Sequence, residues 1–121
     1  MNYKIPLFKT FLPPRNVLMP ALEEILYSGC VTEGFPVEAF EKKFEECFNV
    51  RNCISFNSGT AALHTALVLA GVQEGDEVIS TPMTAEPTNM AIKHAGGRIV
   101  WADVDPRNGN LTAEKIGRAH V

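Results

Sequence analysis

The 121-residue chain lacks the features that mark several large classes of protein. No apolar run approaches the roughly 18 residues that a membrane-spanning helix needs. Residues 1–10 also lack the continuous apolar core of a signal peptide. The formal net charge of −3 leaves no basic surface for nucleic acid. We therefore expect a cytoplasmic protein whose partners include neither a membrane nor a nucleic acid.

Cysteine is scarce, and its spacing excludes two further classes. Cys30, Cys47 and Cys53 are odd in number and form no Cys-x-x-Cys pair. This pattern favours reduced thiols over a disulfide framework, and we expect no metal site. Hydrophobic residues make up 45% of the chain and charged residues 21%, which is typical of one small globular domain or part of a larger one.

The first 50 residues predict an arm and two helices. The prolines between Tyr3 and Pro14 indicate an extended arm. A first helix is expected from about Asn16 or Pro20 to Tyr27, with Pro20 in its first turn. A second helix is expected to open at Pro36, because apolar residues then recur at helical spacing.

From residue 51 to residue 115 the pattern changes to strand–helix–strand–helix–strand. We expect strands at Asn52–Phe56, Glu77–Thr81 and Arg98–Ala102, and helices at Thr60–Ala70 and Pro87–Ala95. Short apolar strands that alternate with amphipathic helices predict a largely parallel sheet in an α/β fold. Trp101 is expected in the core, and Asp103 and Asp105 are expected to shape a turn.

The segment Asn57–Ala62 is the strongest candidate for a ligand site. It lies between an expected strand and an expected helix, so its backbone N–H groups and the helix dipole suit an anion. Ser58 and Thr60 add hydroxyl groups, and Gly59 allows close approach of a ligand. The residues alone leave two interpretations open, a phosphate site or an ordinary helix N-cap. The loop 81–87 would lie at the same edge of a parallel sheet.

Seven segments occur in an order that is similar to a known family, from about residue 12 to residue 115. The chain resembles the N-terminal part of the DegT/DnrJ/EryC1/StrS family of pyridoxal-phosphate-dependent sugar aminotransferases. The segments are Ser28-Gly29 followed by Thr32-Glu33-Gly34, then Val37–Glu41, Ser58–His64, Gly75–Ile79, Pro82 with Thr84, Thr88–Ile92, and Val100–Asp105.

The resemblance implies a fold, a cofactor and a set of contacts. The fold is the N-terminal part of the type I (aspartate aminotransferase-like) large domain, an α/β domain whose mostly parallel sheet is flanked by helices. The cofactor is pyridoxal 5′-phosphate, and the full-length protein is a homodimer. By resemblance the phosphate contacts Ser58, Gly59, Thr60 and Ala61, and the substrate loop contains Thr32, Glu33 and Gly34. Ala85 stands where many members carry a ring that stacks on the cofactor. Glu86 beside it is either a favourable helix-start charge or a site residue.

The resemblance also implies a reaction that this stretch of chain could not perform alone. Members transfer an amino group, usually from glutamate, to a keto sugar linked to a nucleotide. The lysine that forms the Schiff base and the aspartate that pairs with the pyridine nitrogen lie beyond residue 121. The chain therefore contains no catalytic residue and is expected to be an inactive N-terminal fragment. Two alternatives stay open, a sugar dehydratase of the same fold with histidine at the lysine position, and a non-catalytic phosphate-binding domain.

The last six residues, Ile116–Val121, predict a non-native tail. They match the translation of a widely used sequencing-adapter sequence in one frame. We expect a truncated reading frame with read-through, against the alternative of a native helix that begins after Thr112. The codons behind residues 115–121 test this hypothesis.

Overall fold

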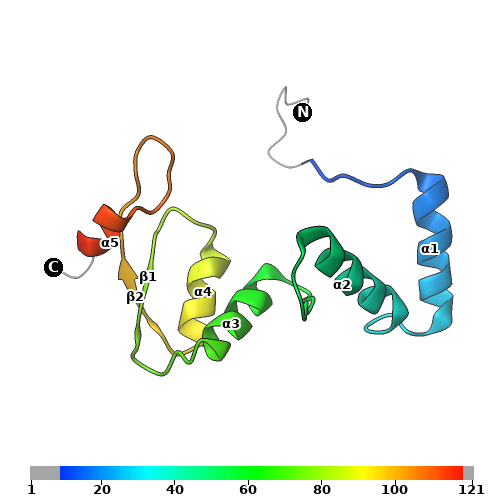
Figure 1. Ribbon diagram of the computed structural model, residues 1–121, viewed down its shortest axis with the longest axis horizontal. Coiled ribbons are helices and arrows are strands. Elements are labelled where there is room, and N and C mark those ends of the chain that lie inside the picture. The colour runs from blue at the N-terminus through cyan, green and yellow to red at the C-terminus, as the bar shows by residue number, and fades with distance from the viewer. Residues whose placement is uncertain (1–8, 119–121) are drawn as a thin grey trace. The chain divides into compact units, whose positions relative to one another are not determined.

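The computed structural model describes residues 9–118 and divides into two compact units, Met1–Ile54 and Ser55–Val121. Half of the arm expected over residues 3–14, residues 3–8, lies outside the described residues, and so do residues 119–121 of the expected tail. Figure 1 shows the helices and strands of both units in chain order.

The first unit contains the helices α1 (Arg15–Ser28) and α2 (Phe35–Phe48). α1 ends at Gly29, whose φ of 76° is a left-handed conformation that glycine adopts without strain. The expected place of Pro20 is wrong, because it lies inside α1 and not in its first turn. α1 begins earlier than expected, directly after Pro14, so Pro20 removes the hydrogen bond that the Asn16 carbonyl would otherwise accept.

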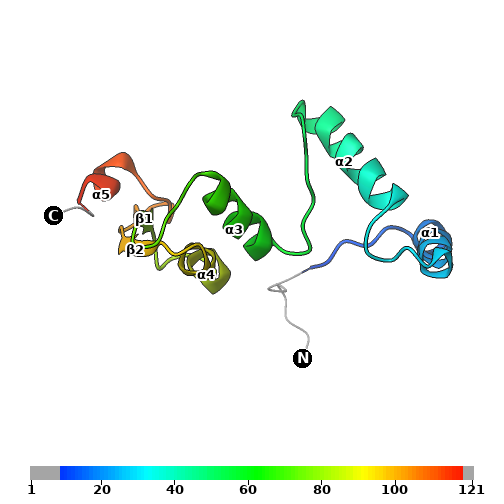
Figure 2. The same ribbon diagram turned by 90° about the horizontal axis from the view of Figure 1, so that it is seen from below.

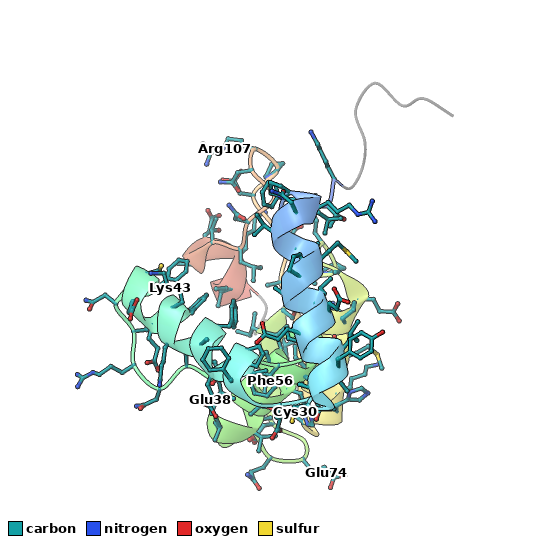
Figure 3. The ribbon with its side chains drawn as sticks, turned by 90° about the vertical axis from the view of Figure 1, so that its right-hand side faces the viewer. Cys30, Glu38, Lys43, Phe56, Glu74 and Arg107 are labelled. Atoms are coloured by element: carbon teal, nitrogen blue, oxygen red, sulfur yellow. The ribbon has the colours of Figure 1, made fainter. Side chains whose placement is uncertain are left out.

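α2 follows Gly34 and has Pro36 in its first turn, where a missing N–H costs nothing. Its apolar stripe brings three rings together, with centroids 6.2 Å apart for Phe40 and Phe44 and 4.4 Å apart for Phe44 and Phe48. Lys43 projects from the same helix (Figure 3) and its Nζ lies 3.4 Å from Glu46. The helix that the spacing of apolar residues predicts is therefore confirmed.

The second unit contains a parallel pair of strands and the helices beside them. In chain order its elements are α3 (Gly59–Leu69), β1 (Glu77–Ser80), α4 (Glu86–His94), β2 (Arg98–Trp101) and α5 (Ala113–Arg118). β1 and β2 pair in register from Glu77↔Arg98 to Ser80↔Trp101. α4 packs against both α3 and β2, and Figures 1 and 2 show α4 alongside the strands, with α5 on their other side. The expected parallel order is therefore confirmed for these two strands.

The expected strand at Asn52–Phe56 is wrong. Residues 53–56 have no regular secondary structure, and Asn52 has a left-handed φ of 59° that a strand cannot contain. The Cys53 N–H donates to Glu45 Oε1 at 2.8 Å and so does not enter a strand ladder. A strand needs a neighbour, and within the described residues β1 and β2 pair only with each other.

Trp101 also differs from expectation, because its side chain is 53% exposed and does not belong to the core. Among the described residues the buried apolar side chains are Ala91, Ile92 and Ala102. Among the described helices only α4 packs extensively on β2, which leaves about half of the Trp101 surface exposed.

The loop after β2 is closed by Asp105, which is 8% exposed. Its carboxylate accepts a hydrogen bond from the Arg107 guanidinium at 2.6 Å and another from the Arg107 backbone N–H at 2.9 Å. These two interactions, the side-chain bond first, hold the pKa of Asp105 below its usual value. Figure 3 shows Arg107 at the edge of this loop. The expected turn chemistry is confirmed for Asp105.

The turn between α3 and β1 depends on close packing at Gly96. A Cβ on Gly96 would lie 3.2 Å from the Glu74 Cα, and the φ of Gly96 is 86°. Gly71 has a similar φ of 84°, but a Cβ there would meet nothing within 4 Å. We expect Gly71→Ala to cost about 1–2 kcal/mol from backbone strain alone. Gly96→Ala should cost about 1 kcal/mol more, because the methyl group also meets backbone.

Urea unfolding of the complete protein, followed by circular dichroism, measures both costs. Gly71→Ala is the matched control, because its new methyl group adds backbone strain but meets no neighbouring atom within 4 Å. Equal unfolding midpoints for the two variants would show that Glu74 moves aside freely.

Candidate functional site

Ser58 sets the start of α3. Its backbone is extended, with φ −156° and ψ 151°, and its Oγ accepts a hydrogen bond from the Ala61 N–H at 3.2 Å. Its carbonyl oxygen accepts from the Ala62 N–H at 3.1 Å. Ser58 is therefore a true N-cap: its carbonyl accepts the first intrahelical bond, and its Oγ satisfies the Ala61 N–H, one of the four N–H groups that a helix start leaves without intrahelical partners.

The N–H groups of Gly59 and Thr60 at the start of α3 are available for a ligand. Within residues 9–118, the Gly59 and Thr60 N–H groups and the Thr60 hydroxyl group have no hydrogen-bond partner. A Cβ on Gly59 would meet nothing within 4 Å, so the space beside this backbone is open. Two free N–H groups and a hydroxyl at the positive end of a helix can bind a phosphate. The Ala61 N–H is already bonded to Ser58, so a phosphate contact to it would compete with the cap.

The second predicted contact region lies at the start of α4. Ala85 is the N-cap residue, with φ −63° and ψ 137°, and Glu86 and Pro87 open the helix. Both Ala85 and Glu86 are exposed. The Glu86 carboxylate lies in the first turn of α4, where the helix dipole favours a negative charge. The geometry accommodates both interpretations of Glu86.

One cavity lies between α3 and α4, and neither Ser58–Ala61 nor Ala85 and Glu86 line it. It has a volume of about 320 Å³ and is lined mainly by α3, β1 and α4, with Leu63, Thr84 and Thr88 among its residues. Thr84 Oγ1 lies 3.2 Å from Thr88 Oγ1. The second turn of α3 and the loop after β1 therefore share one space, whereas the first turn of α3 is not part of its lining.

The predicted substrate loop belongs to the other unit. Thr32 and Glu33 are exposed, and Gly34, with φ 126°, precedes α2. Gly34 and Cys30 line a cavity of about 430 Å³ between α1 and α2, and Figure 3 labels Cys30. The structure thus places Ser58, Gly59, Thr60, Ala61, Ala85 and Glu86 in one unit and Thr32, Glu33 and Gly34 in the other.

Two further observations concern titratable and thiol groups. The rings of His64 on α3 and His94 on α4 lie edge to face with centroids 6.1 Å apart, a pairing that the sequence did not reveal. Cys30, Cys47 and Cys53 are free thiols. Across the part of the chain that the structure describes, no three His, Cys, Asp or Glu side chains are grouped as metal ligands.

The family model of the DegT/DnrJ/EryC1/StrS aminotransferases matches residues 15–119. The chain belongs to this family. The match covers both units and extends into the segment 116–121, for which we predicted a foreign origin. Within residues 9–118, no helix combines the length and apolar character that crossing a membrane requires.

Two curated relatives illustrate the similarity. The chain is 38% identical over 96 residues to the spore coat polysaccharide biosynthesis protein SpsC of Bacillus subtilis, a match that covers 79% of this chain and 25% of that protein. It is 42% identical over 77 residues to the GDP-perosamine synthase of Caulobacter vibrioides, which covers 64% of this chain and 21% of the synthase. The chain therefore spans about a quarter of the length of these relatives.

Solved structures confirm the type I fold. The sugar aminotransferase CalS13 from Micromonospora echinospora matches with a TM-score of 0.84 and 35% identity, over 94% of this chain and 31% of that one. NtdA from Bacillus subtilis with bound cofactor PMP matches with a TM-score of 0.79 and 32% identity, over 84% of this chain and 23% of that one. The E. coli GDP-4-keto-6-deoxy-D-mannose-3-dehydratase matches with a TM-score of 0.80 at 22% identity, which shows the fold alone.

Proposed function

We propose that this chain is the N-terminal part of a pyridoxal-phosphate-dependent aminotransferase. Its substrate would be a keto sugar linked to a nucleotide, and its amino donor an amino acid, glutamate in the first instance. The observation that carries the proposal is the pair of free N–H groups at Gly59 and Thr60, beside an open space, in a chain that belongs to an aminotransferase family. The names of GDP-perosamine synthase and of NtdA with bound PMP support the substrate class and the cofactor.

In this proposal the chain supplies the phosphate-binding half of the site. Gly59 and Thr60 donate backbone hydrogen bonds to the cofactor phosphate, the Thr60 hydroxyl adds a third, and Ser58 keeps the helix start in place. Ala85 and Glu86 lie beside the cofactor ring. When bound, the cofactor supplies the electron sink that amino transfer needs.

In this proposal, residues 32–34 and later parts of the protein supply the remaining contacts. We propose that residues 32–34 contact the sugar, that the complete enzyme is a cytoplasmic homodimer, and that the cofactor-bearing lysine follows later in the chain. A stretch of chain without that lysine could hold a phosphate but could not perform amino transfer.

A dehydratase is the second candidate, because the fold of the E. coli dehydratase also matches. The two enzymes would share every feature of this N-terminal part and differ at the later lysine or histidine position. A non-catalytic phosphate-binding domain is the third alternative.

The complete gene product decides among these functions. We expect a lysine after the last strands of the large domain, and a visible absorption band when pyridoxal 5′-phosphate is added to the purified protein. A histidine at that position would indicate the dehydratase. A protein with neither residue, which binds inorganic phosphate but shows no such band, would contradict both enzyme proposals.

A further inference from the structure

The side chain of Asn89 on α4 joins this helix to the end of β1. Its Nδ2 donates a hydrogen bond to the Thr81 carbonyl oxygen at 3.2 Å, and its Oδ1 accepts one from the Ser80 hydroxyl at 2.6 Å. Ser80 is buried, with 7% of its surface exposed. A single amide therefore holds the last residue of the strand and the first residue of the loop that follows it.

The two hydrogen bonds fix the orientation of the amide. If the amide were rotated by 180°, its oxygen would face the Thr81 carbonyl oxygen, and two acceptors would meet without a proton between them. With the observed orientation, the described residues contain no buried side-chain nitrogen or oxygen without a partner. Asn89 thus makes a specific contact that neither a carboxylate nor an apolar side chain could reproduce.

Loop 81–85 is held at both ends by α4. Asn89 bonds to Thr81 at its beginning, and Thr88 bonds to Thr84 near its end, where Ala85 then caps the helix. Inside the loop, the Thr81 hydroxyl accepts a hydrogen bond from the Met83 N–H at 3.1 Å. The residues from Pro82 to Glu86 are exposed, so they have little other packing to keep them in place.

We propose that Asn89 is a positioning residue for loop 81–85, and that through this loop it sets where Ala85 and Glu86 lie beside the bound cofactor. The second half of this inference rests on the proposed function. The first half concerns the loop alone and is independent of any ligand.

The test is Asn89→Asp in the complete protein, studied by amide hydrogen exchange at pH 7.5 and pH 5.5. The carboxylate places a negative oxygen against the Thr81 carbonyl at the higher pH. We expect the protection factors of residues 81–86 to fall at least tenfold relative to those of α3, and the dissociation constant for pyridoxal 5′-phosphate to rise about tenfold. The facing Thr81 carbonyl oxygen disfavours the ionised form and should raise the pKa of the introduced carboxyl. The protonated carboxyl can donate to the Thr81 carbonyl as the amide does, so we expect protection to recover in part at pH 5.5.

Asn108→Asp is the matched control, because it is the same substitution at an exposed turn. The Asn108 Oδ1 accepts a hydrogen bond from the Asn110 N–H at 2.9 Å, and a carboxylate oxygen at this position can accept the same bond. Glu86 and Lys93 are the charged side chains that line a cavity together with Asn89. The wild-type and control proteins, measured at both pH values, account for any change that pH causes at these two side chains.

Two further variants keep the inference falsifiable. Ser80→Ala keeps the bond to Thr81 and should change loop protection by less than about threefold. Asn89→Ala removes both bonds without adding charge and should lose protection at both pH values, which decides the question if Asn89→Asp does not fold.

Wild-type loop protection in Asn89→Ala, or equal losses in Ser80→Ala and Asn89→Ala, would overturn the role of the Thr81 contact. A wild-type protein that fails to bind the cofactor would refute the proposed function, while the exchange data would still decide whether Asn89 positions the loop.

Discussion

We expect the isolated 121-residue polypeptide to show no cooperative thermal transition and to aggregate on concentration. Among the described residues of the second unit, β1 and β2 pair only with each other, and each keeps an unpaired edge. A two-stranded sheet is marginal without further cover. The large apolar side chains of this unit that stay at least two-fifths exposed are Phe56, Leu63, Val68, Leu69, Met83 and Trp101. This much exposed apolar surface favours association of chains over folding of one.

Circular dichroism during heating measures whether the isolated chain unfolds cooperatively, and amide exchange of the monomeric fraction measures its local stability. We expect a gradual loss of helical signal and local opening free energies below about 3 kcal/mol throughout. The complete gene product, melted under the same conditions, is the control and should unfold in a steep transition. A steep transition in the monomeric 121-residue chain, with strongly protected amides in α4 and β2, would refute the expectation.

Gly59→Ala should weaken binding of pyridoxal 5′-phosphate by the complete protein at least tenfold, without weakening the fold. The new methyl group meets no protein atom within 4 Å, so it occupies the open space beside the free N–H groups of Gly59 and Thr60. Alanine also favours a helix over glycine, so the apo-protein should be as stable as wild type or slightly more stable. A tenfold loss corresponds to about 1.4 kcal/mol of binding free energy.

Ser58→Ala is the opposite control. It removes the cap hydrogen bond to the Ala61 N–H and should lower stability by about 1 kcal/mol without placing an atom in the phosphate space. Spectroscopic titration with the cofactor and thermal melting of the apo-proteins separate the two effects. Unchanged cofactor affinity in Gly59→Ala would place the phosphate elsewhere.

The sequence predicted those elements whose signals are local. The helix at Gly59–Leu69 begins where Ser58 can cap it, and α2 forms where apolar residues recur at helical spacing. Glu77–Ser80 and Arg98–Trp101 form a parallel pair because a short helix connects two apolar runs. Helix caps, apolar periodicity and short connections each involve residues that are close together in the sequence. All the information that they need is therefore present in the sequence.

The expectations that failed depend on distant partners. An apolar run at residues 52–56 predicts a strand, but a strand also needs a neighbour, and none of the described residues provides one. The large apolar side chain of Trp101 predicts a place in the core, yet 53% of its surface is exposed, because among the described helices only α4 packs extensively on β2. Pro20 could be placed only once the true start of α1 was known.

The sequence by itself determined the family and the helix start at Ser58, because these follow from residue order along the chain. Only the tertiary structure decided that a Cβ on Gly59 would enter open space, and that the Asn89 amide reaches back to the Thr81 carbonyl. Those two facts depend on how α3, α4 and β1 pack in three dimensions. Spacing along a sequence does not specify the distance between side chains of different elements.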